Sequence, residues 1–317
     1  MTIPLPPGQA PYITAPMLLS GAWPVSVDFS TLPPGRLQAG SANFAAVTNL
    51  AAEATTECDA FCNQPLRACL STETLHGPGD GANRVTVQNG SGLGRIMLQR
   101  FAIMAVTAVQ VSPNTWPRQW TTVPAGQFGP EYPPIGLYGS QAPSAAGQGG
   151  QAILINQGYV TWCLGRNGFV IQVTYLHGWP HTALTANAAA SATTITVDDC
   201  TGWAPVGGST FGAAGVIYDG AAQEAMNVSA SSVTAGPGTL TLTAPLASPH
   251  QAGTLISSLP QDVIWGAALY AGATALTRGA SSTTTRDTPG RGSGGDGGAD
   301  GLRKAAMGKL VNYRRTI

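Results

Sequence analysis

The chain has 317 residues, a formal net charge of zero and only 9% charged residues, far below the roughly 25% of an ordinary soluble protein. No apolar run approaches the ~20 residues of a membrane span, and the N-terminus has neither the basic flank nor the apolar core of a signal peptide. We therefore expect a protein made in the cytosol. Its sparse charge argues against a free monomer and favours burial in an assembly.

The charge is unevenly spread along the chain. From Arg286 onward there are seven basic and three acidic residues, a net charge of +4, which leaves −4 for the preceding body. A body of this charge is not that of a nucleic-acid-binding protein, whereas the tail suits an acidic partner surface. The five cysteines form no dense framework, so we expect reduced thiols.

The N-terminal part combines an irregular segment with one long helix. Residues 1–40 are rich in proline and glycine and predict an extended arm, with at most a short helix near Ala15–Ser20. From Ser41 to Cys62 the apolar residues recur at helical spacing, and Asn63 and Pro65 end the pattern. The stripe consists of Phe44, Val47, Leu50, Ala51, Ala54, Cys58 and either Phe61 or Cys62.

The next part of the chain predicts short strands around a long loop. The strand-like runs are 70–75, 84–88, 94–98, 103–111, 153–155, 159–164 and 169–175. The loop between residues 112 and 150 contains Trp116, Arg118, Trp120 and Tyr132. Loops this long usually have a function or are covered by a neighbour. The aromatic residues, together with Tyr138, suit a sugar or base platform. With Arg118 they equally suit an interface, which the proline-rich frame and low charge favour.

A second, smaller β unit is expected over residues 184–256. Four strand-like runs, TTITV, GVIYD, QEAMNVSAS and GTLTLT, are separated by Gly, Pro and Asp. In TTITV and TLTLT, Thr and apolar residues alternate as in a half-buried antiparallel sheet. This unit lies between the strand at 169–175 and the helix that follows it, so it is interpreted as an insertion between them.

The stretch Ser257–Gly279 predicts a helix with two apolar faces. We expect a serine cap at Ser257 or Ser258, an acidic first turn at Asp262, and a left-handed stop at Gly279. One face consists of Ile264, Ala267, Ala268, Ala271 and Ala275, and the other of Trp265, Leu269, Gly272 and Leu276. We expect the first face to pack on the 41–62 helix and the second on a neighbouring subunit.

The C-terminal segment, residues 281–317, begins as a Gly-rich linker. It ends in a short amphipathic helix containing Leu302 and Leu310, followed by Tyr313, Arg314 and Arg315. We interpret it as a docking arm. Two arginines alone are weak evidence for DNA binding.

Motifs for catalysis, metals and cofactors are weak. His177 and His181 in HGWPH have a spacing compatible with a metal, but no CxxC or HExxH completes a ligand set, so a turn with backbone-bonded imidazoles is favoured. Glu131 and Glu224 are the candidate carboxylates for a glycosidase-like site, without a recognisable motif. We expect no enzyme activity, no metal and no cofactor.

Four runs carry a resemblance to a known family: SANFAAVTNLAAEATTECDAFCNQPLRA, RIMLQRFAIMAVTAVQVSPNTWPRQWTTVPAG, GRNGFVIQVTYLHGWPH and LPQDVIWGAALYAGATALTRGAS. With them, the chain resembles the head-to-tail adaptor (connector, head-completion) proteins of long-tailed double-stranded DNA bacteriophages. The inserted unit is similar to a small β module of phage structural proteins. Ala102 departs from the pattern, because many relatives have proline there.

The resemblance implies an α+β fold with a small, connector-like helical core, long loops, an inserted antiparallel β domain and extended arms at both ends. The implied parts are an arm (1–40), an adaptor core (41–183 with 257–280), the inserted domain (184–256) and a linker with a basic docking arm (281–317).

The resemblance also implies a homo-oligomeric ring of about twelve copies under the portal protein in the virion neck. Such a ring contacts a downstream connector or tail protein, and double-stranded DNA passes through it without specific binding. The alternatives are another neck or tail protein, such as a stopper, tail terminator or decoration protein, and a secreted polysaccharide-active β protein.

Overall fold

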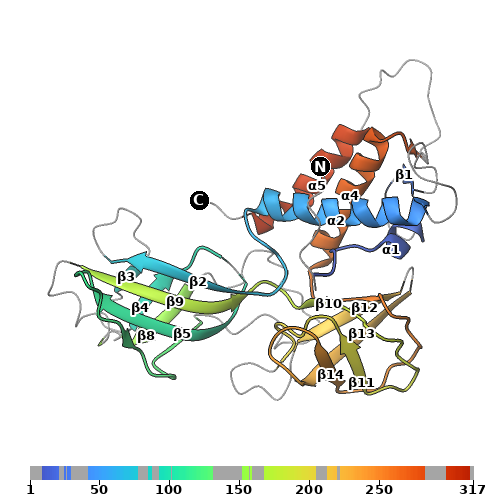
Figure 1. The fold of residues 1–317 in the computed structure, drawn as a ribbon. Coiled ribbons are helices and arrows are strands. Elements are labelled where there is room, and N and C mark those ends of the chain that lie inside the picture. The colour runs from blue at the N-terminus through green and yellow to red at the C-terminus, as the bar shows by residue number, and fades with distance from the viewer. Residues whose placement is uncertain are drawn as a thin grey trace.

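The computed structural model describes residues 9–20, 25, 27–29, 42–77, 85–87, 93–100, 102–130, 152–156, 158, 168–204, 213–219, 222–282 and 298–314. The fold is mixed, with 28% helix and 37% strand, and the strand pairs of its sheets are antiparallel. This content is compatible with the predicted α+β class. Figure 1 shows three units: a group of helices, a two-sheet β unit and a six-stranded β unit.

The helical unit combines segments from both ends of the chain. Its elements are α1 (Ala15–Leu19), α2 (Ala42–Cys62), α4 (Gln261–Thr277), α5 (Ala299–Leu310), the short 3-10 helix η2 (Val311–Tyr313), and the two-residue strands β1 (Val27–Asp28) and β16 (Ser281–Ser282). Most of the predicted α2 stripe is buried against this core, but Phe44 in the first turns is 50% exposed. The N-terminal segment is part of the core: Tyr12, Ile13 and Met17 are fully buried in it. Residues 9–20 of the expected arm are thus packed into the core, and the short helix expected near Ala15–Ser20 is present as α1.

Helix α4 lies at the centre of this unit and is buried on both of its predicted faces. Its acidic first turn at Asp262 and its stop at Gly279, with φ of +92°, agree with the sequence. The predicted serine cap is wrong, because the helix begins after Pro260 and has no side-chain cap. Ser257 instead lies in a β-strand, where its hydroxyl accepts the Leu259 N–H.

The two-sheet unit is a sandwich. One sheet has the order β2 (Cys69–His76), β9 (Phe169–His177), β5 (Ile103–Pro113), β6 (Thr121–Thr122), and the other β3 (Val85–Val87), β4 (Leu93–Met97), β8 (Ala152–Asn156), β7 (Phe128–Pro130). Their inner faces share one core that includes Ile96, Val109, Ile153 and Tyr175. Strands β6 and β7 lie within the predicted long loop. The predicted strand at 159–164 falls outside the described residues.

The six-stranded unit is a small closed barrel. Its order is β10 (His181–Ala183), β15 (Leu255–Ser257), β12 (Ala214–Asp219), β13 (Ala222–Ser231), β14 (Gly238–Leu242), β11 (Thr194–Val197). The two outer strands meet again, because Leu184 bridges to Val197 and the Thr185 N–H donates to the Thr196 carbonyl at 3.0 Å. Trp203 is fully buried inside. The sheet adds β10 and β15 to the four expected strands.

Candidate functional site

The loop after β5 carries one strongly exposed aromatic residue. Trp116 is 90% exposed, whereas Trp120 is half-buried, with the Arg118 guanidinium 5.9 Å from its ring centre. The loop is braced by Ser112, whose hydroxyl accepts the Gln119 N–H at 3.1 Å. Tyr132, predicted to belong to the same surface, lies outside the described residues. Of the described residues of this predicted set, Trp116 and Arg118 are thus exposed to solvent, and Trp116 is the exposed aromatic side chain.

The second face of α4 is covered by the chain's own C-terminal helix, which corrects the prediction of a neighbouring subunit there. A Cβ atom added to Gly266 would lie 2.9 Å from the Leu310 side chain, and one added to Gly272 would lie 3.3 Å from Leu302. Gly266 therefore leaves space that Leu310 of α5 fills, whereas the nearest side chain at Gly272 is Val25, at 2.5 Å, with Leu302 beside it. Leu269, also predicted at this interface, is only 6% exposed.

The rest of the predicted docking arm is anchored on the same core. The Lys309 ammonium lies 3.0 Å from Asp262 and 4.1 Å above the ring of Trp265. Tyr313 is buried, packs edge-on against Trp179 and accepts the Gln64 amide through its carbonyl at 3.2 Å.

Beyond Tyr313 the chain reaches solvent. Arg314 is exposed, and its guanidinium lies 5.4 Å from the Phe61 ring. Arg315 lies outside the described residues. Leu302, Leu310, Trp265 and Tyr313 are thus brought together as an intrachain packing surface.

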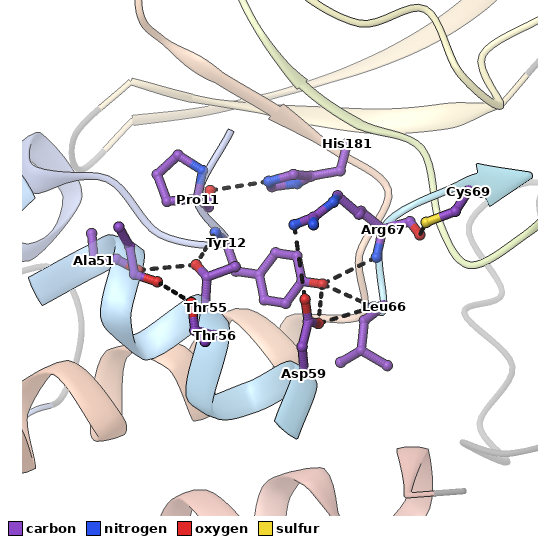
Figure 2. A network of polar contacts seen from close by, with 11 residues as sticks. Pro11, Tyr12, Ala51, Thr55, Thr56, Asp59, Leu66, Arg67, Cys69 and His181 are labelled. Atoms are coloured by element: carbon purple, nitrogen blue, oxygen red, sulfur yellow. Dashed lines mark hydrogen bonds and ion pairs between the residues drawn. The ribbon is translucent and has the colours of Figure 1, made fainter. Parts of the chain in front are cut away.

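A buried polar network joins the N-terminal segment, α2 and the start of β2 (Figure 2). The Tyr12 hydroxyl donates to Asp59 at 2.5 Å and accepts the backbone N–H groups of Leu66 and Arg67 at 2.8 and 3.2 Å. The Tyr12 N–H donates to the Thr55 hydroxyl at 2.9 Å. We call this group the polar junction. It was missed from the sequence, where the only signal is a tyrosine within a Pro-rich arm.

Burial raises the pKa of both acidic groups of the polar junction. Burial, followed by the nearby Asp59, raises the pKa of Tyr12, and burial also raises the pKa of Asp59 against the opposing effects of Tyr12, Arg67 and a backbone N–H. Arg67 lies 3.8 Å from Asp59. These groups are bonded to one another, which suits a rigid joint.

The two histidines of HGWPH lie where the sandwich passes into the barrel. His177, the last residue of β9, lies 2.9 Å from the Ser71 hydroxyl. His181, the first residue of β10, lies 2.8 Å from the Ser257 hydroxyl and 3.0 Å from the Pro11 carbonyl. Burial lowers the pKa of His177 to about 3 and that of His181 to about 4. Both rings are neutral and take part in hydrogen bonds.

The backbone between these histidines requires glycine. Gly178 has φ of +87°, and a Cβ atom there would lie 2.3 Å from the Arg67 carbonyl oxygen. Its N–H donates to the carbonyl of Ala102, which has φ of +60°. The backbone at Ala102 could not be adopted by the proline that many relatives have at this position, because proline fixes φ near −65°. The turn therefore holds the two β units in a defined relation.

A second polar cluster, missed from the sequence, lies in the barrel. The ring nitrogens of His250 lie 3.2 Å from Asp219 and 3.0 Å from Glu224. Glu224 also accepts the N–H groups of Ala247 and Ser248 at 2.6 and 3.2 Å. Burial alone would raise the pKa of Glu224, but these N–H groups and His250 lower it below its usual range. Glu131, the other candidate carboxylate, lies outside the described residues.

Within the described ranges, no group of three or more His, Cys, Asp or Glu side chains is arranged to hold a metal ion. Over the same residues, the helices are too short or too polar to cross a lipid bilayer. No protein-family model matches the chain, and searches of curated proteins and of solved structures likewise give no significant match.

Proposed function

We propose that the protein is a structural component of a phage virion, a head-to-tail adaptor that forms a ring under the portal, extends the DNA channel and joins capsid to tail. The proposal includes a connector-like helical core, formed here by α2, α4 and α5. It begins from the sequence resemblance, and the organisation of the chain supports it.

The observation that carries the proposal is Trp116, which is 90% exposed at the loop after β5 in a chain with only 9% charged residues. Tryptophan is a typical anchor of protein interfaces, since it buries a large area at a low entropic cost. Solvent exposure of such a side chain is unfavourable in a free subunit and is relieved when a neighbour covers it.

The helical unit suits a subunit that is held firmly while its β units contact neighbours. The polar junction and the α4–α5 packing fix both chain ends in one core. The basic Arg314 at the exposed end of that core suits an acidic surface of the portal protein.

The test is assembly with the portal protein of the same virus. The two proteins are co-expressed, and the complex is examined by native mass spectrometry and electron microscopy. We expect a symmetric ring of about twelve copies on the portal. Trp116→Ala should lose the ring while keeping the fold, and Val233→Ala, an exposed apolar residue in the barrel, should keep it.

Rings that form without portal contact would instead indicate a stopper, tail terminator or other neck protein. A protein that remains a monomer with and without the portal protein would contradict the proposal. Binding of the isolated chain to a glycan array would favour the polysaccharide-active alternative.

A further inference from the structure

Strand β2 forms an open edge of the sandwich. It is the last strand in the order β2-β9-β5-β6, and its eight residues, CLSTETLH, pair with β9 along their whole length without a register shift. Among the described residues, no strand pairs with its other side.

The ladder shows which backbone groups of β2 face away from β9. The Gly77 N–H donates to the Phe169 carbonyl at 2.7 Å, and antiparallel bonding alternates from residue to residue. Counting back from Gly77, the N–H and C=O groups of every second residue point outward: these are His76, Thr74, Thr72 and Leu70. The hydroxyls of Thr72 and Thr174 lie 3.0 Å apart, as expected for the close, non-hydrogen-bonded pairs of such a ladder.

This edge lacks most of the features that protect edge strands against pairing with another chain. Natural proteins protect edge strands with lysine, proline, bulges, short length, inward-pointing charges or a covering helix or loop. Strand β2 has no Lys, Arg or Pro, it is eight residues long, and it has no bulge. Its single formally charged residue, Glu73, accepts the Gln99 N–H and the Tyr175 hydroxyl within the subunit. The other edge strands of the sandwich, β3, β6 and β7, have only two or three residues.

The solvent-facing side of the same sheet is also uncharged. Leu70 is 62% exposed and pairs with Leu176. The rows beyond it contain Thr72, Thr74, Thr174, Gln172, Gln110, Thr122 and Ala108, and β2 ends at the exposed His76. A charged partner gains nothing from such a surface. A second copy of the chain brings an equally uncharged strand, so the two edges meet without like-charge repulsion.

The position of Glu73 selects the register of such a pair. In a two-fold antiparallel contact centred on Glu73, the two carboxylates would lie opposite each other, which is unfavourable. Centred on Thr72, the contact sets Thr72 against its own copy, Leu70 against Thr74, and Glu73 against Ser71. A centre at Thr74 also separates the carboxylates but overlaps fewer residues of β2.

We propose that two copies of the free protein pair through their β2 edges, antiparallel, with Thr72 on the two-fold axis. The contact is isologous and joins the two β2-containing sheets into one eight-stranded sheet. It goes beyond the proposed adaptor function and does not rest on it.

The first test is the mass of the full-length protein in solution, measured by size-exclusion chromatography with light scattering. The chain is 32.3 kDa, so we expect about 65 kDa for the wild type. Thr72→Lys, which places a charge on the axis, should reduce the mass to that of a monomer without changing the melting temperature by more than a few degrees. Thr122→Lys is the matched control, because it places the same charge on the opposite edge strand β6 and should leave the dimer intact.

The second test is cross-linking. Thr72→Cys should give a disulfide-linked dimer on a non-reducing gel after mild oxidation, since the two Thr72 residues face each other across the axis. Thr107→Cys, exposed on the inner strand β5, and the wild type with its native cysteines should not. A monomeric wild type, or a dimer that survives Thr72→Lys, would overturn the proposal. Loss of the dimer with Thr122→Lys as well would replace it with a head-to-tail β2–β6 contact.

Discussion

The barrel and the sandwich are built from similar antiparallel strands but treat their edges differently. The barrel closes on itself where Leu184 meets Val197. The sandwich keeps its two sheets apart and leaves β2 without a partner on one side in the described residues. Closure removes the backbone groups that another chain could pair with, whereas an open edge keeps them available. The barrel is therefore a self-contained unit, whereas the sandwich has a strand edge at which another chain could pair.

The largest expected effect comes from emptying the barrel core. Trp203 is fully buried, and a Cβ atom added to Gly215 would lie 2.7 Å from its ring. Trp203→Ala should lower the free energy of unfolding by about 3–5 kcal/mol, as measured by urea denaturation. Hydrogen exchange should rise in the barrel while the β2–β9 ladder keeps its protection. Val233→Ala, at an exposed site of the barrel, is the control. Equal loss of protection in both units would show that the barrel is not self-contained.

A smaller effect is expected from opening the barrel seam. Asp198 accepts the Thr182 hydroxyl at 2.5 Å and the Ala183 N–H at 2.8 Å. Asp198→Ala leaves these donors without their acceptor and should cost about 1–3 kcal/mol. Exchange of the Thr185 amide, which bonds across the seam, reports the opening directly. Asp198→Asn keeps an acceptor oxygen and should lose less; an equal loss would argue against this role.

The connection between the sandwich and the barrel, which contains His177 and His181, should make the free energy of unfolding depend on pH. His181 is buried with a pKa of about 4, below its unfolded value of about 6.5. Its contribution to stability is therefore complete above pH 6.5 and is lost as the pH falls toward 4, because only the unfolded chain takes up the proton. We expect a loss of about 1 kcal/mol from this group between pH 6.5 and 5.5, measured by urea denaturation at each pH.

Two variants show how much of this pH dependence of the free energy of unfolding comes from the barrel and how much from the sandwich. His181→Asn should remove the contribution of the barrel's first strand. His177→Asn should remove a contribution of the same sign from the last residue of β9, whose pKa is about 3. An unchanged slope in both variants would contradict the assignment.

The smallest change in the free energy of unfolding is expected for a variant in the helical unit, with which the changes in both β units can be compared. Arg278 bonds to both carboxylate oxygens of Glu53 at 2.9 and 2.7 Å, with its side chain 46% exposed. Arg278→Ala should cost about 0.2–1 kcal/mol, and less at high salt. Denaturation curves at low and high salt test this. A loss above 2 kcal/mol would indicate a larger structural role for the pair.

The sequence predicted the local elements well because their signals are local. The apolar spacing of α2 and α4, the acidic first turn at Asp262 and the left-handed stop at Gly279 need no distant partner. The alternating Thr and apolar residues of the barrel strands likewise depend only on which side of a strand is buried. The α+β class follows from these elements.

The rest depended on contacts between distant residues. Ser257 was misassigned as a cap because its role is set by His181, which lies 76 positions earlier in the chain. The second face of α4 was assigned to another subunit because the contacts of Leu310 at Gly266, and of Val25 and Leu302 at Gly272, are not visible in any one segment alone. Tyr12 and Asp59 were missed for the same reason, being 47 positions apart. The open edge of β2 is a property of strand order, which periodicity does not encode.

The participation of both chain ends in one helical core has a consequence for biosynthesis. The Cys62 thiol bonds to the Leu310 carbonyl, and Gln64 bonds to that of Tyr313, contacts that span 248 and 249 positions. When α2 leaves the ribosome, its partners α4 and α5 have not yet been made. The sandwich and the barrel lie in the sequence between α2 and α4, so they can fold while the apolar stripe of α2 is still exposed to solvent. The first long helix to be synthesised is thus among the last to be packed, and the time for which it stays exposed is set by the rate at which two entire β units are translated.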